Sequence, residues 1–377
     1  MGNMNEICSS YSGRRVLVTG YNGFKGTWLC LWLKLMGADV LGIGNDLPST
    51  PSMNEAVAAD DLVRGMRIDI NDYTKLAQVV ADFKPEVVFH LAAQALVRPS
   101  YEDPLGTLST NIMGTAHVLE ACRHTPSVRS IVIVTSDKCY RNNEWVWGYR
   151  ENDPMGGHDP YSVSKGCAEL VTTSYIKSFF PHEKYGQTHH VAVASARAGN
   201  AIGGGDWGKD RLIPDCVRAL HANTAIHIRY PTAVRPWQHA LECLSGYLML
   251  GAKLLEYGPK FGCGWNFAPI DMGDVWPVER VVKRICRLWG NGTYAVDKGV
   301  QPHEAHMLCL DCTKANIELG WRPRYTVAEA LEQTTAWYRA WAENPDPAHM
   351  RQVTLDQISA YANKPEDNAQ DESHERS

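Results

Sequence analysis

The fold of this chain is decided by RRVLVTGYNGFKG, residues 14–26. The apolar run Val16 to Val18 leads directly into a turn in which three glycines stand three residues apart. An amphipathic segment follows, from about Gly26 to Met36. This order predicts a buried parallel strand, a glycine turn and then a helix.

The alternation of strand and helix continues beyond this stretch. Apolar runs predict strands, and segments of helical periodicity predict helices. The further expected strands cover 39–43, 87–90, 130–135 and 190–195, and the further expected helices cover 73–83, 111–124 and 161–179. This order predicts an α/β fold with a Rossmann-like, doubly wound parallel sheet, in which ligands bind at the carboxyl ends of the strands.

The pattern becomes looser after about Ala196, where glycine and proline interrupt it. We expect a dinucleotide-binding Rossmann domain over 14–196 and a smaller, mainly substrate-binding C-terminal lobe over 197–345. Helices near 213–222 and 240–257 belong to this second part, and the chain is allowed to cross between the lobes. Residues 364–377 are polar and acidic, which predicts a tail without fixed structure.

Composition narrows the classes of function. A net charge of −5 gives no electrostatic reason to expect nucleic-acid binding. No apolar run reaches the roughly 18 residues that a membrane span needs. The eleven scattered cysteines, without a charged-then-apolar leader, predict reduced thiols and a cytoplasmic protein. Neither the single pair Cys309 and Cys312 nor His303 with His306 matches a zinc pattern, so we expect no metal.

The glycine turn predicts a dinucleotide site. Gly20 permits the tight turn, Gly23 lets backbone amides approach a pyrophosphate, and Gly26 lets the helix pack on the sheet. The spacing differs from the common G-x-G-x-x-G, so a purely structural glycine turn is the alternative. The neighbouring residues expected to bind the cofactor are Asn22, Phe24 and Lys25.

Residues after three further strands complete this expected site. Asp46 lies twenty residues after Gly26, where a carboxylate binds ribose hydroxyls and favours NAD over NADP; the alternative is a turn residue before Pro48. Asp69 with Ile70 is expected near the adenine, unless Asp69 is only a surface residue. Small residues at the end of another strand suit close passage of the cofactor, or simple packing; these are Leu91, Ala92 and Ala93.

A serine, tyrosine and lysine set carries the expected redox chemistry. Tyr161 and Lys165 stand at i and i+4, so their side chains project from one face of a helix. An ammonium beside a phenol lowers the pKa of the phenol, and Tyr161 would then remove a hydroxyl proton while a nicotinamide takes the hydride. Ser136, at the end of a neighbouring strand, would hold the same hydroxyl.

Together these motifs resemble the extended short-chain dehydrogenase/reductase family, whose members are NAD-dependent epimerases and dehydratases. The likeness runs from about Arg14 to Trp341, and within the family it is greatest to dehydratases that act on CDP-glucose. Its most specific stretches are 23–26, 135–140, 145–151, 197–207 and 235–239. The resemblance implies a tightly held NAD and a hydro-lyase that converts CDP-glucose to CDP-4-dehydro-6-deoxyglucose.

The resemblance also implies roles for Asp137 and Lys138. The sugar would be oxidised at carbon 4, water would leave across carbons 5 and 6, and the hydride would return to carbon 6. Asp137 would protonate the departing hydroxyl, which requires a raised pKa, and Lys138 would remove the carbon 5 proton, which requires a lowered pKa. The dTDP-glucose dehydratases have a glutamate in place of Lys138, so Lys138 is alternatively a residue that positions the sugar, or the partner of Asp137 in a local salt bridge.

Nucleotide-sugar binding is expected in the second lobe. A diphosphate favours the planar forks of arginine, and Arg211 and Arg235 are the candidates. The resemblance adds Asn200 at the diphosphate. Trp237 and His239 are expected to bound the base or to be packing residues, and His303 with Glu304 faces the nucleotide or forms a surface loop. The other expected contacts are Gln94, Leu212 and Ile213.

Three alternative functions remain at this stage. The first is a 4,6-dehydratase that acts on another nucleotide sugar, because sequence spacing does not distinguish cytosine from other bases. A nucleotide-sugar 4-epimerase shares the fold, NAD, Tyr161 and Lys165 but has no elimination step that needs Asp137 and Lys138. A redox-sensing binding protein would be free to lose Tyr161 or Lys165. The resemblance further suggests a homodimer or homotetramer formed by the helices near Asn111 and Tyr161, and a product destined for deoxysugars of the cell surface such as those of lipopolysaccharide.

Overall fold

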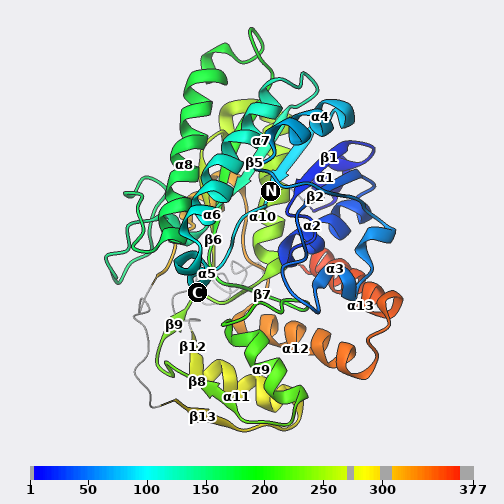
Figure 1. Ribbon diagram of the computed structural model, residues 1–377, viewed down its shortest axis with the longest axis vertical. Helices are drawn as coiled ribbons and strands as arrows, with labels where there is room; N and C mark the ends of the chain where they lie inside the picture. Colours follow the sequence, from blue (N-terminus) through cyan, green and yellow to red (C-terminus); the bar gives the residue numbers. More distant parts are fainter. Residues whose placement is uncertain (1–3, 270–275, 298–307, 366–377) are drawn as a thin grey trace, which may run out of the picture.

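A seven-stranded sheet, entirely parallel, forms the centre of the molecule (Figure 1). The computed structural model describes residues 4–269, 276–297 and 308–365. The strand order is β11-β6-β5-β4-β1-β2-β3. The strands are β1 (Arg15–Thr19), β2 (Asp39–Gly44), β3 (Arg64–Arg67), β4 (Val87–His90), β5 (Ser130–Val134), β6 (Ala192–Ala198) and β11 (Gly264–Phe267).

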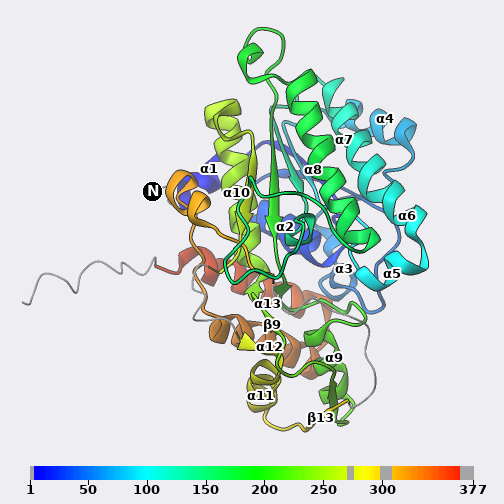
Figure 2. The same cartoon turned by 90° about the vertical axis from the view of Figure 1, so that its left-hand side faces the viewer.

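Helices cover both faces of this sheet, as Figure 2 shows. Side chains alternate between the faces of a strand, so Val16 and Val18 belong to one core and Leu17 to the other. Leu17 faces α4 (Tyr73–Phe83), α7 (Gly114–Arg123) and α8 (Pro160–Phe179). The opposite face is covered by α1 (Met4–Tyr11), α2 (Phe24–Leu35) and α10 (Ala240–Tyr257).

Short elements connect these helices and strands. The α-helical ones are α3 (Met53–Ala56), α5 (Val97–Glu102) and α6 (Pro104–Leu108). A π-helical turn, η2 (Ser109–Met113), joins α6 to α7. The remaining short turns in the described part are η1 (Ala59–Asp61), η3 (Asp137–Cys139), η4 (His182–Lys184), η5 (Gly258–Phe261) and η7 (Ala315–Leu319).

A smaller lobe lies beside the carboxyl ends of the strands (Figure 1). Its helices are α9 (Leu212–His221), α11 (Val278–Trp289) and α12 (Val327–Glu343). Its strands form three two-stranded pairs: β7 (Ala201–Ile202) with β10 (Gln238–His239), β8 (Ile226–Ile228) with β13 (Tyr294–Val296), and β9 (Val234–Arg235) with β12 (Trp276–Pro277).

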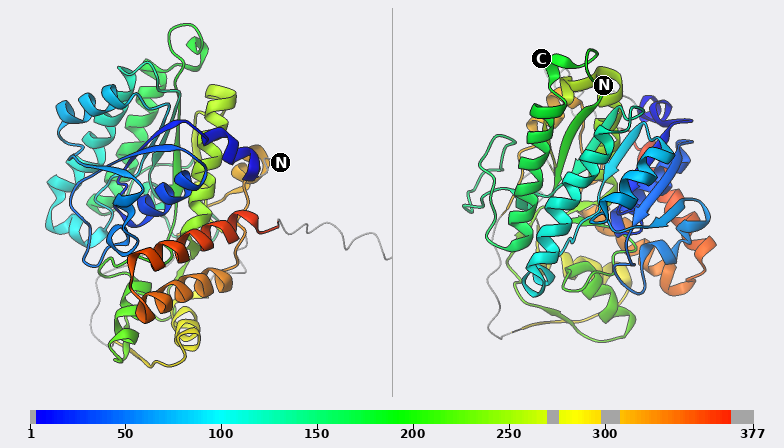
Figure 3. Two further views of the ribbon diagram at one scale, coloured as in Figure 1. Left: turned by 90° about the vertical axis from the view of Figure 1, so that its right-hand side faces the viewer. Right: turned by 45° about the horizontal axis from the view of Figure 1, so that its top comes forward.

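The last helix, α13 (Pro347–Asn363), returns to the first lobe. It contacts α2, and the rings of Trp32 and Tyr361 meet edge-on with centroids 5.7 Å apart. Figure 3 shows this helix alongside α12 and close to the N-terminal part of the chain. The C-terminal helix therefore packs over α2.

The predicted sheet is confirmed, with two strands that the sequence reading missed. β3 has the sequence RGMR and is exposed along its length, so it lacks an apolar pattern. β11 comes from within the expected second lobe and pairs with β6, which itself runs to Ala198, two residues past the expected boundary at 196. The expected helix from Asn111 begins as the π-helical turn. Of the expected tail, residues 366–377 lie outside the described residues.

No helix in the described ranges combines the length and the apolar character that spanning a membrane demands. The same ranges contain no group of three or more His, Cys, Asp or Glu side chains arranged to hold a metal ion. All eleven cysteines are described, and each is a free thiol. Cys309 and Cys312 are buried, and the sulfur of Cys312 accepts a hydrogen bond from the amide of Ala268, so this pair packs as ordinary structural cysteines.

Candidate active site

One cavity of about 2160 Å³ opens at the carboxyl ends of the strands. Both lobes line it, and among the described residues its walls include every predicted site residue except His239. Parallel sheets of this kind bind ligands at this edge. The cavity therefore joins the expected cofactor and substrate residues in one continuous space.

The glycine turn forms a cradle at one end of the cavity. Gly20 has a φ of +73°, and a Cβ there would lie 2.7 Å from the amide nitrogen of Ala92. A Cβ on Gly26 would lie 1.9 Å from the carbonyl oxygen of Gly20, so only glycine allows α2 to begin so close to the turn. Gly23 caps α2 without a side-chain hydrogen bond, which leaves first-turn amides to bind an anion. This cradle fits a pyrophosphate.

Acidic and amide side chains line the cavity next to the cradle. Asp46 is exposed just after β2. Asn22 donates to the carbonyl oxygen of Asn45 at 2.7 Å and thereby fixes the segment that carries Asp46. The carboxylate of Asp69 accepts the backbone amide of Asn71 at 2.8 Å. The other predicted cofactor residues in this wall are Phe24, Lys25, Ile70, Leu91, Ala92 and Ala93.

The residues expected to perform the chemistry meet at the end of β5. The hydroxyl of Ser136 donates to the carboxylate of Asp137 at 2.7 Å and accepts the amide of Lys138 at 3.2 Å. Ser136 is also hydrogen-bonded to Tyr161, which comes from the first turn of α8. Asp137 is buried, Lys138 is half-buried, and no ion pair joins their side chains. The local salt bridge considered above is therefore not formed.

The pKa of Tyr161 differs from the sequence-based expectation. Burial raises the pKa of Tyr161 to about 12, against the smaller lowering effect of the Ser136 hydrogen bond. Burial, followed by the charge of Lys25, lowers the pKa of Lys165 to about 8. The Lys165 ammonium donates to the carbonyl oxygen of Val134 at 3.4 Å. The prediction that Lys165 lowers the pKa of Tyr161 below its usual value is thus wrong, because burial of the phenol dominates.

Cationic and polar side chains of both lobes line the cavity near this group. Arg211 lies just before α9 and donates to Asp206 at 2.9 Å, and Arg235 lies on β9. The side chain of Gln94 is fixed by hydrogen bonds to Leu96 and Thr107. The predicted substrate residues that line the cavity are Gln94, Asn200, Arg211, Leu212, Ile213, Arg235 and Trp237.

The structure corrects the placement of His239. Its ring is fully buried between Trp28 and Tyr325, and its Nδ1 accepts the amide of Leu241, so it caps α10 and does not line the cavity. Burial lowers its pKa to about 3. Trp237 lines the cavity but donates its indole N–H to the carbonyl oxygen of Trp276. His303 and Glu304 lie outside the described residues.

Several residues at the site were missed by the sequence reading. Glu169 and Arg197 form a buried ion pair of 2.8 Å behind the catalytic turn. A signal existed, since Glu169 stands four residues after Lys165 on the same helical face. At the cavity rim, the carboxylate of Asp210 lies 2.7 Å from Arg98 of the first lobe and 3.7 Å from Arg229 of the second. Nothing in the sequence pattern indicated that these three would meet.

The comparisons with known proteins agree with this geometry. A family model described as GDP-mannose 4,6 dehydratase matches residues 17–334. The chain belongs to the extended short-chain dehydrogenase/reductase family. Within this family, it is 52% identical over 337 residues to the CDP-glucose 4,6-dehydratase of Salmonella typhimurium, covering 89% of this chain and 93% of that one.

Solved structures resemble most of the chain. Epimerase Mth375 of Methanothermobacter thermautotrophicus matches with a TM-score of 0.79 and 22% identity, covering 91% of this chain and 97% of that one. MoeE5 in complex with UDP-glucuronic acid and NAD matches with a TM-score of 0.70 and 25% identity, covering 86% and 99%. The first of these likenesses establishes the fold alone.

Proposed function

We propose that this chain is an NAD-dependent hydro-lyase that converts CDP-glucose to CDP-4-dehydro-6-deoxyglucose. The observation that carries the proposal is the pair Asp137 and Lys138, which stand beside Ser136 and Tyr161 on the wall of the cavity. The 52% identity to a CDP-glucose 4,6-dehydratase supports the substrate.

The residues present fit NAD, since the glycine cradle would be filled by any Cβ at Gly20 or Gly26. The turn and the first amides of α2 hold the pyrophosphate, and Asp46 binds the adenosine ribose. Bound at this place, NAD supplies the acceptor and later the donor of a hydride. The relative MoeE5, solved with NAD, supports this choice of cofactor.

Tyr161 is the base for the hydroxyl on carbon 4 of the sugar. Ser136, which is hydrogen-bonded to Tyr161, holds the same hydroxyl. With a pKa of about 8, Lys165 is mostly protonated at pH 7, and its charge on the same helical face favours the phenolate form of Tyr161, which takes the hydroxyl proton and becomes the neutral phenol. These three residues serve the oxidation.

Asp137 and Lys138 serve the elimination. A ketone at carbon 4 makes the proton on carbon 5 acidic, and Lys138 removes this proton. Asp137, buried and hydrogen-bonded to Ser136, gives a proton to the departing hydroxyl of carbon 6. One water is thereby lost. Lys138 is half-buried in the cavity wall, and from there it can later return a proton to carbon 5.

The second lobe binds the nucleotide diphosphate. The cavity is lined by Arg211, Arg235 and Asn200, which can donate hydrogen bonds to the oxygens of the diphosphate. We assign the diphosphate to these residues and the base to the neighbourhood of Trp237, whose ring is buried at the cavity wall.

We further propose a homodimer or homotetramer that works in the cytoplasm on precursors of cell-surface deoxysugars. The support for self-association is a set of exposed apolar side chains on α6, η2 and α8: Leu105, Met113, Leu170 and Phe179. The support for a reducing compartment is that all eleven cysteines are free thiols.

A nucleotide-sugar 4-epimerase is the second candidate, because epimerase Mth375 shares the fold. An epimerase performs the oxidation but not the elimination. Mass spectrometry of the protein given CDP-glucose in deuterated water separates the two, with UDP-, GDP- and dTDP-glucose in parallel. Loss of one water from CDP-glucose, with one solvent deuterium at carbon 5, is the expected result. An epimerised sugar of unchanged mass would reject the dehydratase.

A further inference from the structure

A buried ion pair lies directly behind the turn that carries Asp137 and Lys138. Glu169 on α8 and Arg197 on β6 are 2.8 Å apart, and their side chains are only 4% and 5% exposed. Neither residue lines the cavity. The pair is therefore outside the group that touches substrate or cofactor.

Glu169 holds the residue that precedes the turn. Its carboxylate accepts the hydroxyl of Thr135 at 2.5 Å, the hydroxyl of Ser195 at 2.6 Å and a guanidinium nitrogen of Arg197. Burial acts to raise the pKa of Glu169, but Arg197 and the hydroxyl donors outweigh it, so the pKa is lowered. A charged carboxylate thus ties Thr135, the residue after β5, to Ser195 on β6.

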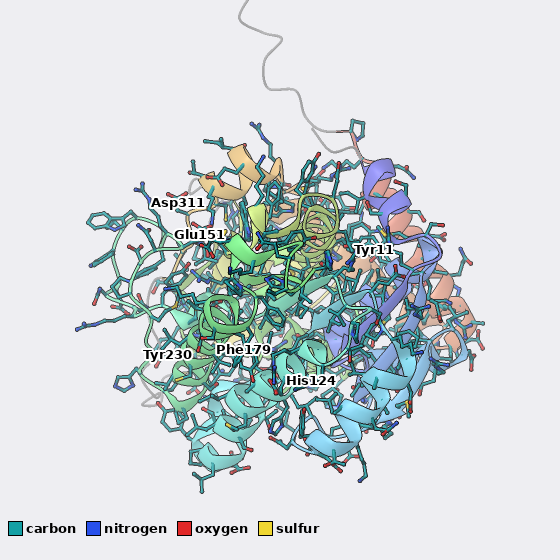
Figure 4. The ribbon with its side chains drawn as sticks, turned by 90° about the horizontal axis from the view of Figure 1, so that it is seen from above. Tyr11, His124, Glu151, Phe179, Tyr230 and Asp311 are labelled. Carbon is teal, nitrogen blue, oxygen red and sulfur yellow. The ribbon has the colours of Figure 1, made fainter. Side chains whose placement is uncertain are left out.

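Arg197 holds the residue that follows the turn. It donates to the hydroxyl of Tyr140 at 2.6 Å and to the carbonyl oxygen of Glu151 at 2.9 Å, and its guanidinium lies over the Tyr140 ring at 5.2 Å. The Tyr140 hydroxyl in turn donates to Asn266 on β11 at 2.8 Å. Asn266 also contacts Glu151 and Asp311, which lie near each other in Figure 4.

The contacts of Glu169 and Arg197 fix the two ends of the turn that carries the proposed catalytic residues. Thr135 and Tyr140 are the residues on either side of 136–139, which carry Ser136, Asp137 and Lys138. The turn itself is a single 3₁₀ turn, which has few internal hydrogen bonds to define its position. Its placement depends on what fixes its two ends.

We infer that Glu169 and Arg197 act as one positioning unit, which fixes both ends of the 136–139 turn and so sets where Asp137 and Lys138 meet carbons 5 and 6 of the sugar. The inference rests on the proposed dehydratase function. The Glu169 end lies next to Ser136 and affects oxidation and elimination together. The Tyr140 end lies two residues after Lys138 and affects elimination above all.

The test compares Tyr140→Phe with Ser195→Ala in the full chain. Tyr140→Phe keeps the ring over Arg197 but removes the hydroxyl between Arg197 and Asn266. Ser195→Ala removes a donor to the same Glu169 carboxylate from the side away from the turn. Rapid mixing with CDP-glucose in deuterated water follows two quantities: the near-ultraviolet absorbance of reduced nicotinamide, which reports oxidation, and deuterium at carbon 5, which reports elimination.

We expect Tyr140→Phe to lower the rate of deuterium incorporation at least about tenfold relative to oxidation, so that reduced nicotinamide accumulates. Ser195→Ala is expected to keep the wild-type ratio of the two rates even if the protein is less stable, since a general loss of folded enzyme lowers both rates equally. Thr135→Val is expected to slow both steps.

Two results would overturn the inference: an unchanged ratio in Tyr140→Phe, or an equal change of the ratio in Ser195→Ala. The activity of the wild-type protein with nucleotide sugars distinguishes a wrong positioning role from a wrong proposed function. If the wild type dehydrates CDP-glucose while the ratio in Tyr140→Phe is unchanged, only the positioning role is wrong. If the wild type dehydrates no nucleotide sugar, the function itself is wrong.

Discussion

The two walls of the cavity hold their charges in different ways. Behind the first-lobe wall, the ion pair of Glu169 and Arg197 is 4–5% exposed and has further hydrogen bonds on both partners. At the rim, Arg98 and Asp210 are 42% and 45% exposed. Breaking a buried pair costs about 3–5 kcal/mol, whereas an exposed pair contributes about 0–1 kcal/mol. The wall that carries the proposed catalytic residues is thus fixed, while the exposed rim has ion pairs that exchange easily.

Tyr161→Phe should have the largest effect on the fixed wall. Without the phenolic hydroxyl no base is present for the carbon 4 hydroxyl, and turnover of CDP-glucose should fall by about 10³-fold. Steady-state rates measure this loss, and calorimetric titration with CDP serves as the control, because binding of the nucleotide should be kept. Turnover within tenfold of the wild type would assign the base elsewhere.

Lys138→Ala should abolish one step and spare the other. Deuterium incorporation at carbon 5 should fall by about 10²-fold, since the general base for that proton is lost. Oxidation should continue, because Ser136 and Tyr161 remain, and reduced nicotinamide should accumulate. Retained incorporation in the product would show that Lys138 positions the sugar and that another group removes the proton.

Lys165→Met should stabilise the protein without its ligands. A pKa of about 8, against the usual 10.5, means that folding disfavours the charged form, by about 3 kcal/mol at pH 7. Because the pKa is lowered on folding, the wild type gains stability as the pH rises from 8 to 10.5. Allowing for the lost hydrogen bond to Val134, the variant should gain about 1–2 kcal/mol at pH 7, and the gain should shrink toward pH 10.5.

Urea unfolding at several pH values measures this gain. A variant that is less stable than the wild type at pH 7 would mean that Lys165 has a partner that outweighs its burial. Such a result would also weaken the contrast between Lys165, which is buried without a carboxylate within ion-pair distance, and Arg197, which is buried with one.

Asp210→Asn should have the smallest effect. Arg98 and Arg229 lose a shared carboxylate and become available to the diphosphate of the substrate, so the KM for CDP-glucose should fall by roughly two- to fivefold at low salt. The effect should vanish at high salt, where exposed charges are screened. Glu120→Gln, which removes a partner of Arg123 on α7, is the matched control and should leave KM unchanged. A raised KM would mean that Asp210 supports binding.

Much of the sheet was predictable because its buried strands are short apolar runs. The helices 73–83 and 240–257 were predicted with the bounds that the structure has. β3 escaped prediction because an exposed edge strand needs no apolar side chains, and β11 because its pairing with β6 joins residues about seventy positions apart in the sequence. Pairing at that distance depends on the whole fold rather than on local pattern.

The candidate site was predictable where one element carries several members. Tyr161 and Lys165 share a helical face, so their spacing predicts that they are neighbours. Ser136, Asp137 and Lys138 are consecutive and are neighbours for that reason. His239 was misplaced because the resemblance located its segment but not the direction of its ring, which turns into the core against Trp28. The Asp210 cluster draws on three separate segments, and no local rule connects them.

The pairing of β11 with β6 has a consequence for synthesis of the chain. Until residues 264–267 have been synthesised, the first six strands can form a sheet only with β6 as an unpaired edge. Exposed strand edges promote association with other chains. The edge is closed only when Gly264–Phe267 emerges, and α2 receives its cover from α13 later still. A released fragment that ends at residue 198 would therefore expose both surfaces, and cutting the gene at this place should yield an aggregating fragment rather than an isolated NAD-binding domain.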